Sequence, residues 1–326
     1  MESENKMPAV ELINYLPNIG IDNVKQEIFD GLKSTPKYIS PKFFYDGKGS
    51  ELFEQITKLE EYYPTRTEKS IISNKVSELG IDFKNLDIVE LGSGDSSKIS
   101  LLLEQIPQDL IPTINYFPVD ISKSAIEKSS NDLKAKFQLK SITGVVVDFF
   151  HQMHLIPKTG RRLFCFFGST IGNFSRKQAE DFMIALGKSM QKGDMLLIGM
   201  DLVKNVDVLE AAYNDKKGIT ALFNTNILNV VNNLSGTNFT ENNFEHYSFF
   251  NTKESRIEMH LRALKDVEVK LDSEIIKIYK GELIHSENSH KFTLDDINTI
   301  AKWSKLNIVR SLTDDNNWFS LNYFVK

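Results

Sequence analysis

The sequence has almost no cysteine: Cys165 is the single one in 326 residues. A disulfide within the chain is therefore excluded. Cys165 lies inside the apolar run L-F-C-F-F at residues 163–167. We expect it to be a buried small hydrophobic side chain and not a nucleophile.

The sequence also lacks a large excess of charge of either sign, and it lacks long apolar runs. The formal net charge of -5 and the isoelectric point near 5.8 give no electrostatic footprint for nucleic acid or an anionic membrane. No apolar run approaches the roughly 20 residues of a membrane span. The first residues, MESENKMPAVE, are acidic and polar, unlike a signal peptide. We expect a cytoplasmic globular protein without nucleic-acid or membrane partners, and a monomer by default.

A third glycine is missing from the turn that follows a predicted buried strand at residues 88–91. Gly92-Ser93-Gly94 leads from this strand toward a predicted helix at residues 98–106. Such a turn leaves backbone N–H groups free, and its missing side chains let a ligand lie on the main chain. Without the third glycine of the dinucleotide fingerprint, a nicotinamide cofactor is disfavoured. Taken alone, the turn is equally consistent with a tight turn that binds nothing.

From residue 88 onward, strand and helix patterns alternate. Such alternation predicts βαβ units and a parallel sheet covered on both faces. Ser122 and Ser175 are expected to be the N-caps of two of the helices. The predicted strands are 88–91, 116–120, 144–148, 163–167 and 195–201, and the predicted helices are 98–106, 123–137 and 176–190.

The C-terminal residues 306–312 and 319–325 predict two strands joined by a polar turn. A closing hairpin of this kind adds an antiparallel strand to a parallel sheet. By analogy at the level of the fold, this is how the sheet of class I S-adenosylmethionine methyltransferases ends. The predicted fold class is α/β, with a Rossmann-like, mostly parallel sheet.

Two acids lie at the ends of predicted strands. Asp120 ends the second strand and Asp148 ends the third. In doubly wound sheets, ligands bind outside the carboxyl ends of the strands. The first acid could accept hydrogen bonds from ribose hydroxyls, and the second could reach an adenine edge. Each alone could be a solvated carboxylate, but together with Gly92 and Gly94 they favour an adenosine-type ligand.

The aromatic segment at residues 38–69 lies outside this scheme. Ser50 is expected to cap a helix at residues 51–56, and Pro64 is expected to end it before another helix begins near residue 67. Tyrosines beside the turns, Tyr45 and Tyr62 among them, are predicted to present hydroxyls to a pocket. Surface packing is the alternative.

Residues 202–292 are too long for a simple crossover connection. They contain asparagine-rich, loop-like sequence at 224–243, followed by predicted strands at 245–250, 256–264 and 275–279. We interpret this region as a second α+β lobe that forms a substrate pocket. The expected domains are a cofactor-binding core (67–203 and 292–326) and a substrate-binding lobe (15–66 and 204–291).

Long motifs throughout the chain resemble the histidine-specific S-adenosylmethionine-dependent methyltransferases of ergothioneine biosynthesis. The resemblance runs from about residue 38 to the end. The motifs are F-F-Y-D-G-K-G-S-E-L-F-E (43–54), E-Y-Y-P-T-R-T-E (61–68), E-L-G-S-G (90–94), G-S-T-I-G-N-F (168–174), D-L-V-K (201–204), L-E-A-A-Y-N-D-K-K-G-I-T-A-L-F-N (209–224), I-E-M-H-L-R (257–262) and E-N-S-H-K-F (287–292).

The resemblance implies S-adenosylmethionine as cofactor, L-histidine as substrate, and no metal. It implies that Tyr45 and Asn173 serve catalysis, without any residue named as general base. The implied cofactor site is Gly92, Gly94, Lys98, Asp120 and Asp148. The implied substrate site is Tyr45, Phe53, Tyr62, Gly168, Thr170, Asn173, Tyr213, Met259, Glu287 and Ser289.

In the family, the positions of Asn173 and Tyr213 hold the backbone end of the amino acid, and those of Glu287 and Ser289 hold its imidazole. Two residues apart in an extended segment, Glu287 and Ser289 would point the same way. A surface carboxylate beside Lys291 is the alternative for Glu287, and a core residue is the alternative for Met259.

The function implied is in-line transfer of methyl groups to the α-amine of histidine, giving hercynine. Alignment of a neutral amine would carry most of the catalysis, and aromatic faces would suit the growing ammonium. One alternative is N-methylation of another aromatic amino acid, such as a tryptophan derivative. A non-catalytic regulator that binds S-adenosylmethionine is another. The sequence departs from many relatives at Ser169, where they have glycine.

Overall fold

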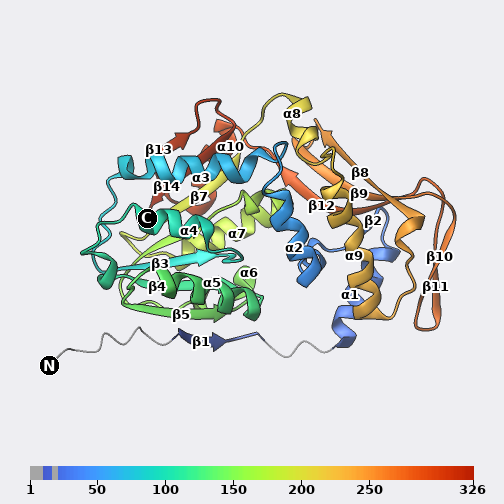
Figure 1. Ribbon diagram of the computed structural model, residues 1–326, viewed down its shortest axis with the longest axis horizontal. Coiled ribbons are helices and arrows are strands. Elements are labelled where there is room, and N and C mark those ends of the chain that lie inside the picture. Colours follow the sequence, from blue (N-terminus) through green and yellow to red (C-terminus); the bar gives the residue numbers. More distant parts are fainter. Residues whose placement is uncertain (1–9, 17–20) are drawn as a thin grey trace. The chain divides into compact units, whose positions relative to one another are not determined.

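The computed structural model describes residues 10–16 and 21–326, which form two compact units. Unit 1 combines residues 10–16 with Arg66–Leu202 and Phe292–Lys326. Unit 2 combines residues 21–65 with Val203–Lys291. Each unit therefore draws on segments that are far apart in the sequence (Figure 1).

Unit 1 is built on an eight-stranded sheet. Its strands, in spatial order, are β1 (Val10–Asn14), β5 (Ser141–Val146), β4 (Asn115–Asp120), β3 (Leu86–Leu91), β6 (Arg161–Phe166), β7 (Met195–Asp201), β14 (Phe319–Val325) and β13 (Asn307–Thr313). The strands from β1 to β7 are parallel, whereas β14 is antiparallel to both β7 and β13. The predicted Rossmann-like, mostly parallel sheet with its terminal antiparallel hairpin is confirmed. The edge strand β1 was not expected.

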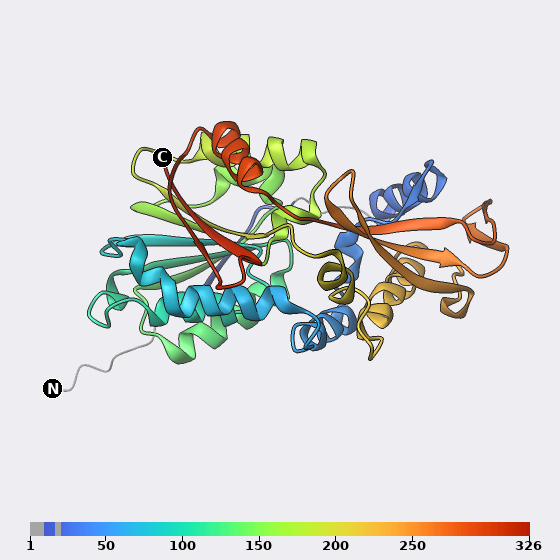
Figure 2. The same cartoon turned by 90° about the horizontal axis from the view of Figure 1, so that it is seen from above.

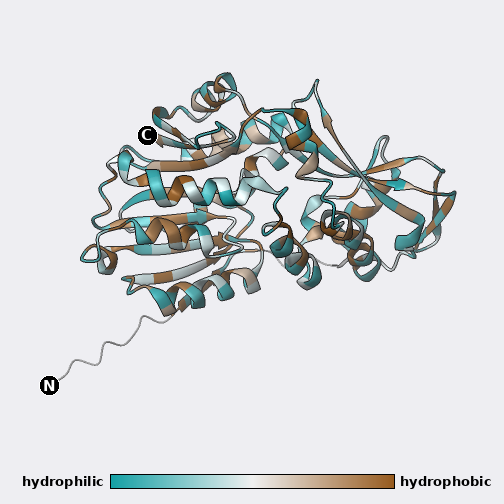
Figure 3. Cartoon of the chain, turned by 45° about the horizontal axis from the view of Figure 1, so that its top comes forward, coloured by the Kyte–Doolittle hydropathy of each residue, from teal (hydrophilic) through white to brown (hydrophobic). Residues whose placement is uncertain are grey.

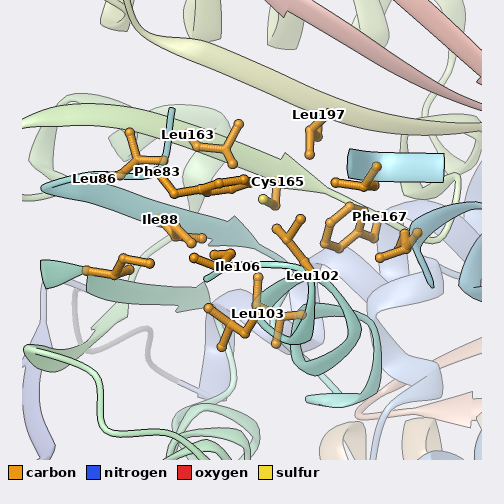
Figure 4. Packing of buried hydrophobic residues seen from close by; sticks show 14 of the residues in the cluster. Phe83, Leu86, Ile88, Leu102, Leu103, Ile106, Leu163, Cys165, Phe167 and Leu197 are labelled. Carbon is orange, nitrogen blue, oxygen red and sulfur yellow. The ribbon is translucent and has the colours of Figure 1, made fainter. Parts of the chain in front are cut away.

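Alternation along the buried strands divides the core of unit 1 between the two faces of the sheet. Ile88 of β3 packs into one hydrophobic cluster and its neighbour Val89 into the other, as the period of two in a strand requires. Figure 4 shows the first cluster, in which Cys165 is fully buried among Leu163, Leu197 and other apolar side chains. Burial raises the pKa of the Cys165 thiol, so it packs as a hydrophobic residue, as expected.

Helices cover both faces of the sheet (Figure 2). They are α3 (Tyr63–Lys75), α4 (Ser97–Glu104), α5 (Lys123–Lys136), α6 (Phe149–Gln152), α7 (Arg176–Ser189) and α10 (Leu294–Ser304). Hydrophobic and hydrophilic residues follow one another along them, which is the pattern of helices with one face on a core (Figure 3). Ser122 caps α5, and Ser175 caps α7 in a capping box, both as predicted.

Unit 2 contains a four-stranded sheet with the order β2 (Lys37–Tyr38), β12 (Leu283–His290), β9 (Arg256–Ala263) and β8 (Phe244–Asn251). Strand β9 is antiparallel to both of its neighbours. The strands β10 (Val267–Leu271) and β11 (Glu274–Ile278) form a separate hairpin. The helices of this unit are α1 (Ile21–Lys33), α2 (Gly47–Ile56), α8 (Val206–Ala211) and α9 (Ile219–Ser235), and α9 packs against β8, β9, α1 and α2.

Strand β12 contains a bulge between His285 and Glu287. His285 lies opposite His260 of β9, and Glu287 lies opposite Met259, so Ser286 is the extra residue. The buried Ser286 hydroxyl is 2.7 Å from Oδ1 of Asn224. Because Asn224 belongs to α9, this contact fixes the bulge to a helix.

Two expectations for the N-terminal segment were wrong. Asp46, and not Ser50, caps the first helix of the aromatic segment, because its carboxylate accepts from the Gly49 N–H at 2.7 Å. Pro64 does not end a helix but lies in the first turn of α3. A proline costs nothing there, since the first N–H groups of a helix have no partner within the helix.

The asparagine-rich sequence was also misjudged, because residues 224–233 lie in α9 and not in a loop. The apolar residues between the asparagines, such as Phe223 and Ile227, are buried and give this segment its helical face. Tertiary packing therefore overrides the low helix propensity of asparagine. None of the helices among the described residues is long and apolar enough to cross a membrane.

Candidate functional site

The glycine turn of unit 1 has the form of a ligand cradle. Gly92 adopts a left-handed φ of +73°, and added Cβ atoms at Gly92 and Gly94 would meet nothing within 4 Å. Beside them, the buried hydroxyl of Ser93 has no hydrogen-bond partner in the described part of the chain. Open space next to an orphaned polar atom fits a ligand that lies on the main chain.

The two strand-end acids lie on strands adjacent to this turn. Asp120 ends β4, and burial raises its pKa, while its carboxylate accepts from the Ser122 N–H at 2.8 Å. Strand β5 ends at Val146, so Asp148 does not end the third strand as predicted. It caps α6 instead, where it accepts from the Phe150 N–H at 2.9 Å. Gly92, Gly94, Asp120 and Asp148 therefore follow three neighbouring parallel strands at the edge where such sheets bind ligands.

Lys98, on the first turn of α4, pairs with a carboxylate that the sequence analysis missed. Its Nζ lies 2.7 Å from the fully buried carboxylate of Glu68, on α3. The two oxygens of Glu68 also accept from the Gly168 N–H, at 2.8 and 3.0 Å. Gly199 is obligatory beside them, since a Cβ there would lie 2.0 Å from Glu68. One carboxylate thus joins α3, α4 and the loop after β6.

That loop carries three predicted substrate residues. Gly168 has a φ of +80°, and Thr170 donates from its hydroxyl to the carbonyl of Phe167 at 2.9 Å. Asn173 ends the short 3-10 helix η5 (Thr170–Asn173). Ser169 has a φ of 55°, a conformation that suits glycine better, and its hydroxyl accepts from the Asp201 N–H at 2.9 Å. The loop is therefore held by hydrogen bonds to β7 and α3 in a strained conformation.

In unit 2, the predicted aromatic residues form one continuous chain of edge-to-face rings. Tyr45 contacts Phe53 with ring centroids 5.9 Å apart, Phe53 contacts Tyr62 at 6.3 Å, and Tyr62 contacts Tyr213 at 6.0 Å. Phe223 of α9, which the sequence analysis did not single out, packs against Phe53 at 5.9 Å. Tyr45 is 49% exposed, so one end of this chain of rings is open. Such an arrangement presents π faces and phenol hydroxyls side by side.

Strand β12 and its neighbour β9 bring the remaining predicted residues to the same place. Glu287 and Met259 lie opposite each other in the sheet, and both are buried. Ser289, two residues beyond Glu287, accepts from the Tyr213 hydroxyl at 2.7 Å. This contact joins the chain of rings to β12. The alternative of a surface carboxylate at Glu287 is excluded by its burial, whereas Met259 is both a core residue and a neighbour of Glu287.

Burial gives the site its electrostatic character. Desolvation raises the pKa of Glu287 to about 7, and the charge of Lys291 opposes this rise. Lys291 is fully buried, with its Nζ 2.8 Å from Ser289 Oγ. The burial of Lys291 gives no sign in the sequence, since a lysine near a glutamate ordinarily indicates a solvated pair.

In unit 1, desolvation raises the pKa of Glu90 to about 8 although the Tyr116 hydroxyl donates to it.

Comparison with known proteins matches the sequence of this chain to a family. Residues 24–326 match the family described as "Histidine-specific methyltransferase, SAM-dependent". The chain belongs to this family. Its members depend on S-adenosylmethionine, and the resemblance read from the motifs is confirmed.

Three relatives illustrate the similarity. The chain is 37% identical over 305 residues to histidine N-alpha-methyltransferase of Mycobacterium tuberculosis (strain CDC 1551 / Oshkosh), covering 93% of this chain and 95% of that protein. It is 38% identical over 293 residues to the protein of that name from Mycolicibacterium smegmatis, covering 89% and 91%. It is 28% identical to ergothioneine biosynthesis protein 1 of Schizosaccharomyces pombe, covering 76% of this chain but 33% of that protein.

Proposed function

We propose that this protein transfers methyl groups from S-adenosylmethionine to the α-amine of L-histidine, three in succession, giving hercynine. The observation that carries the proposal is the buried carboxylate of Glu287 beside Ser289 on β12, in a chain of the histidine-specific family. A buried carboxylate and a buried hydroxyl match the N–H and the lone pair of a polar ring. A site of this kind rejects analogues that lack matching groups far better than an apolar slot does.

The residues of unit 1 fit S-adenosylmethionine. Open space at Gly92 and Gly94 would receive its amino-acid end, with the Ser93 hydroxyl beside it. The Asp120 carboxylate would accept from the ribose hydroxyls, and Asp148 would lie at the adenine edge. Lys98 would lie close to the carboxylate end, where its ion pair with Glu68 fixes its position.

When bound, S-adenosylmethionine would supply an electrophilic methyl group on a sulfonium, and a neutral amine would displace the thioether from that methyl without help from an acid at the sulfur. The protein's own part is then to bind and orient the amine. The Asn173 amide and the Tyr213 hydroxyl would hold the backbone end of the amino acid, since an amide adds no charge. The lone pair of the amine would form the N–C bond while the C–S bond breaks and S-adenosylhomocysteine leaves. After the first and second transfers the new ammonium would lose a proton to solvent, whereas the quaternary product of the third transfer has no N–H proton to lose.

Successive methylation requires tolerance of a growing cation. Tyr45, Phe53 and Tyr62 would present ring faces and edges to it, and cation–π attraction would compensate for lost hydrogen bonds to the amine. We therefore assign Tyr45 and Asn173 to alignment of the amine, and Gly168, Thr170 and Met259 to the walls around the substrate. Alignment of this kind supplies a large part of the rate enhancement in group-transfer reactions.

The test is to incubate the protein with S-adenosylmethionine and each common amino acid in turn, and to follow product masses. Histidine should gain three methyl groups, and omission of S-adenosylmethionine should abolish the gain. Methylation of tryptophan or another amine in place of histidine would overturn the substrate. Binding of S-adenosylmethionine in calorimetry without methylation of any amine would favour a regulator.

A further inference from the structure

Lys291 is an unusual residue for the inside of a protein. Its side chain has no exposed surface, although it ends in an ammonium. Nζ donates to Ser289 Oγ at 2.8 Å and to the Tyr213 hydroxyl at 3.2 Å, and it lies 4.9 Å from the centre of the Tyr213 ring. Burial of a cation is costly unless the charge is paired and hydrogen-bonded. Both hydroxyl partners belong to residues assigned to the substrate.

The direction of these hydrogen bonds follows from the chemistry of the groups. An ammonium only donates, whereas a serine hydroxyl has one hydrogen to donate and two lone pairs to accept with. Ser289 Oγ accepts from Lys291 and, at 2.7 Å, from the Tyr213 hydroxyl. With both lone pairs engaged, the hydroxyl hydrogen of Ser289 is the group left to meet a ligand. Ser289 is thereby fixed as a donor.

Glu287 offers the opposite polarity on the same face of the strand. The positive charge of Lys291 favours the ionised form of this carboxyl against desolvation. An ionised carboxylate only accepts hydrogen bonds. A neutral imidazole has one N–H and one ring lone pair, which match one acceptor and one donor.

We propose that Lys291 is a positioning residue that fixes Ser289 as a donor and Glu287 as an acceptor, so that hydrogen-bond direction selects the neutral imidazole of the substrate. This inference rests on the proposed function. Lys291 itself does not touch the reacting atoms. It acts through Ser289, Tyr213 and Glu287, whose polarity it sets.

The main experiment replaces Lys291 with methionine, which is similar in length and uncharged. Lys291→Met should raise the KM for histidine at pH 8 by about tenfold or more, the effect of losing a buried hydrogen bond to a charged group. It should change kcat at saturating histidine by less than about threefold, and S-adenosylhomocysteine affinity not at all, because the cofactor residues lie elsewhere. Lys37→Met is the matched control, since Lys37 pairs with Glu282 at 3.3 Å in the same sheet and contacts no assigned substrate residue.

A second readout separates positioning from simple structural support. In Lys291→Met, the acidic limb of kcat/KM for histidine should move to higher pH, because Glu287 loses the cation that favours its ionised form. The limb should stay in place in Lys37→Met. The substrate's own titration is the same in both variants and cancels in the comparison.

A third readout uses ring analogues with the wild-type protein, so it does not depend on the folding of any variant. A pyrrolylalanine that keeps the ring N–H but lacks the ring lone pair should be used at least about tenfold less efficiently than histidine, because the Ser289 donor would lack an acceptor. In Lys291→Met this discrimination should shrink. Equal use of both substrates by the wild type, or an unchanged KM and acidic limb in a folded Lys291→Met, would overturn the inference and leave the proposed function standing. Failure of the wild type to methylate histidine would instead overturn the proposed function.

Discussion

Replacement of Glu287 by glutamine should change activity and stability in opposite directions. The carboxylate is buried, and desolvation holds its pKa at about 7, compared with the ordinary value of 4.5. At pH 8 the wild-type protein therefore carries a buried negative charge that glutamine does not. In the proposed complex, the amide would keep the shape of the side chain but would accept a weaker hydrogen bond from the imidazole N–H. The variant should be a poorer enzyme and a more stable protein.

The magnitudes follow from hydrogen-bond strength and from proton linkage. A hydrogen bond to a charged group contributes about 1.5–3 kcal/mol, so Glu287→Gln should raise the KM for histidine by about 10- to 100-fold. The raised pKa means that the folded protein holds a proton that the unfolded chain releases. The stability from this proton is fully present below pH 4.5 and is lost as pH rises through about 7. The loss amounts to about 3 kcal/mol and should be absent from the variant.

The assay is urea unfolding of the wild type and Glu287→Gln at pH 4.5 and pH 8, with histidine kinetics at pH 8. The two proteins should have equal free energies of unfolding at the lower pH, and the variant should be the more stable at the higher pH. Glu282→Gln is the control, because Glu282 is a partly exposed carboxylate that pairs with Lys37. A Glu287→Gln protein that is less stable than wild type at pH 8, or that keeps the wild-type KM, would refute the reasoning.

Two further substitutions test the loop after β6. Glu68→Gln should lower the free energy of unfolding by about 2–3 kcal/mol in denaturant titrations, because it leaves Lys98 without its buried carboxylate. For the same reason it should weaken S-adenosylhomocysteine binding in calorimetry. Unchanged binding would show that this ion pair does not contribute to the cofactor site. Ser169→Ala should be about 1 kcal/mol less stable than Ser169→Gly in thermal unfolding, because both lose the hydrogen bond from Asp201 but only alanine keeps the strain of the left-handed φ of 55°. The reverse order would show that the loop carries no such strain.

The central sheet could be predicted because its signal is local. Each buried strand reads as a short apolar run, and Ser122 and Ser175 mark where the following helices begin. The hairpin at the C-terminus was equally visible, since a polar turn separates two apolar stretches. Strand β1 gave no such signal, because it is short and only partly buried at the edge of the sheet.

The polar core of each unit could not be predicted, because it depends on contacts between distant segments. Glu68 meets Gly168 across 100 positions of the chain, and Lys291 meets Tyr213 across 78. Neither residue differs in its local sequence from a solvated charge on a surface. For α9, the deciding information was the packing of Phe223 and Ile227, which no asparagine count reveals.

The bulge at Ser286 has a consequence for how this enzyme can change through evolution or design. Side chains on a strand alternate between its faces, and the extra residue sets the phase of everything after it. Because Ser286 is accommodated as the extra residue, Glu287 and Ser289 share the face of Met259 and Ile257. A regular pairing of the same sequence, with Ser286 opposite Met259, would turn Glu287 and Ser289 to the other face and bring Ser286 and Asn288 into their places. A point substitution on β12 therefore alters one contact at a time, whereas a shift of register at the bulge would exchange both side chains in a single step.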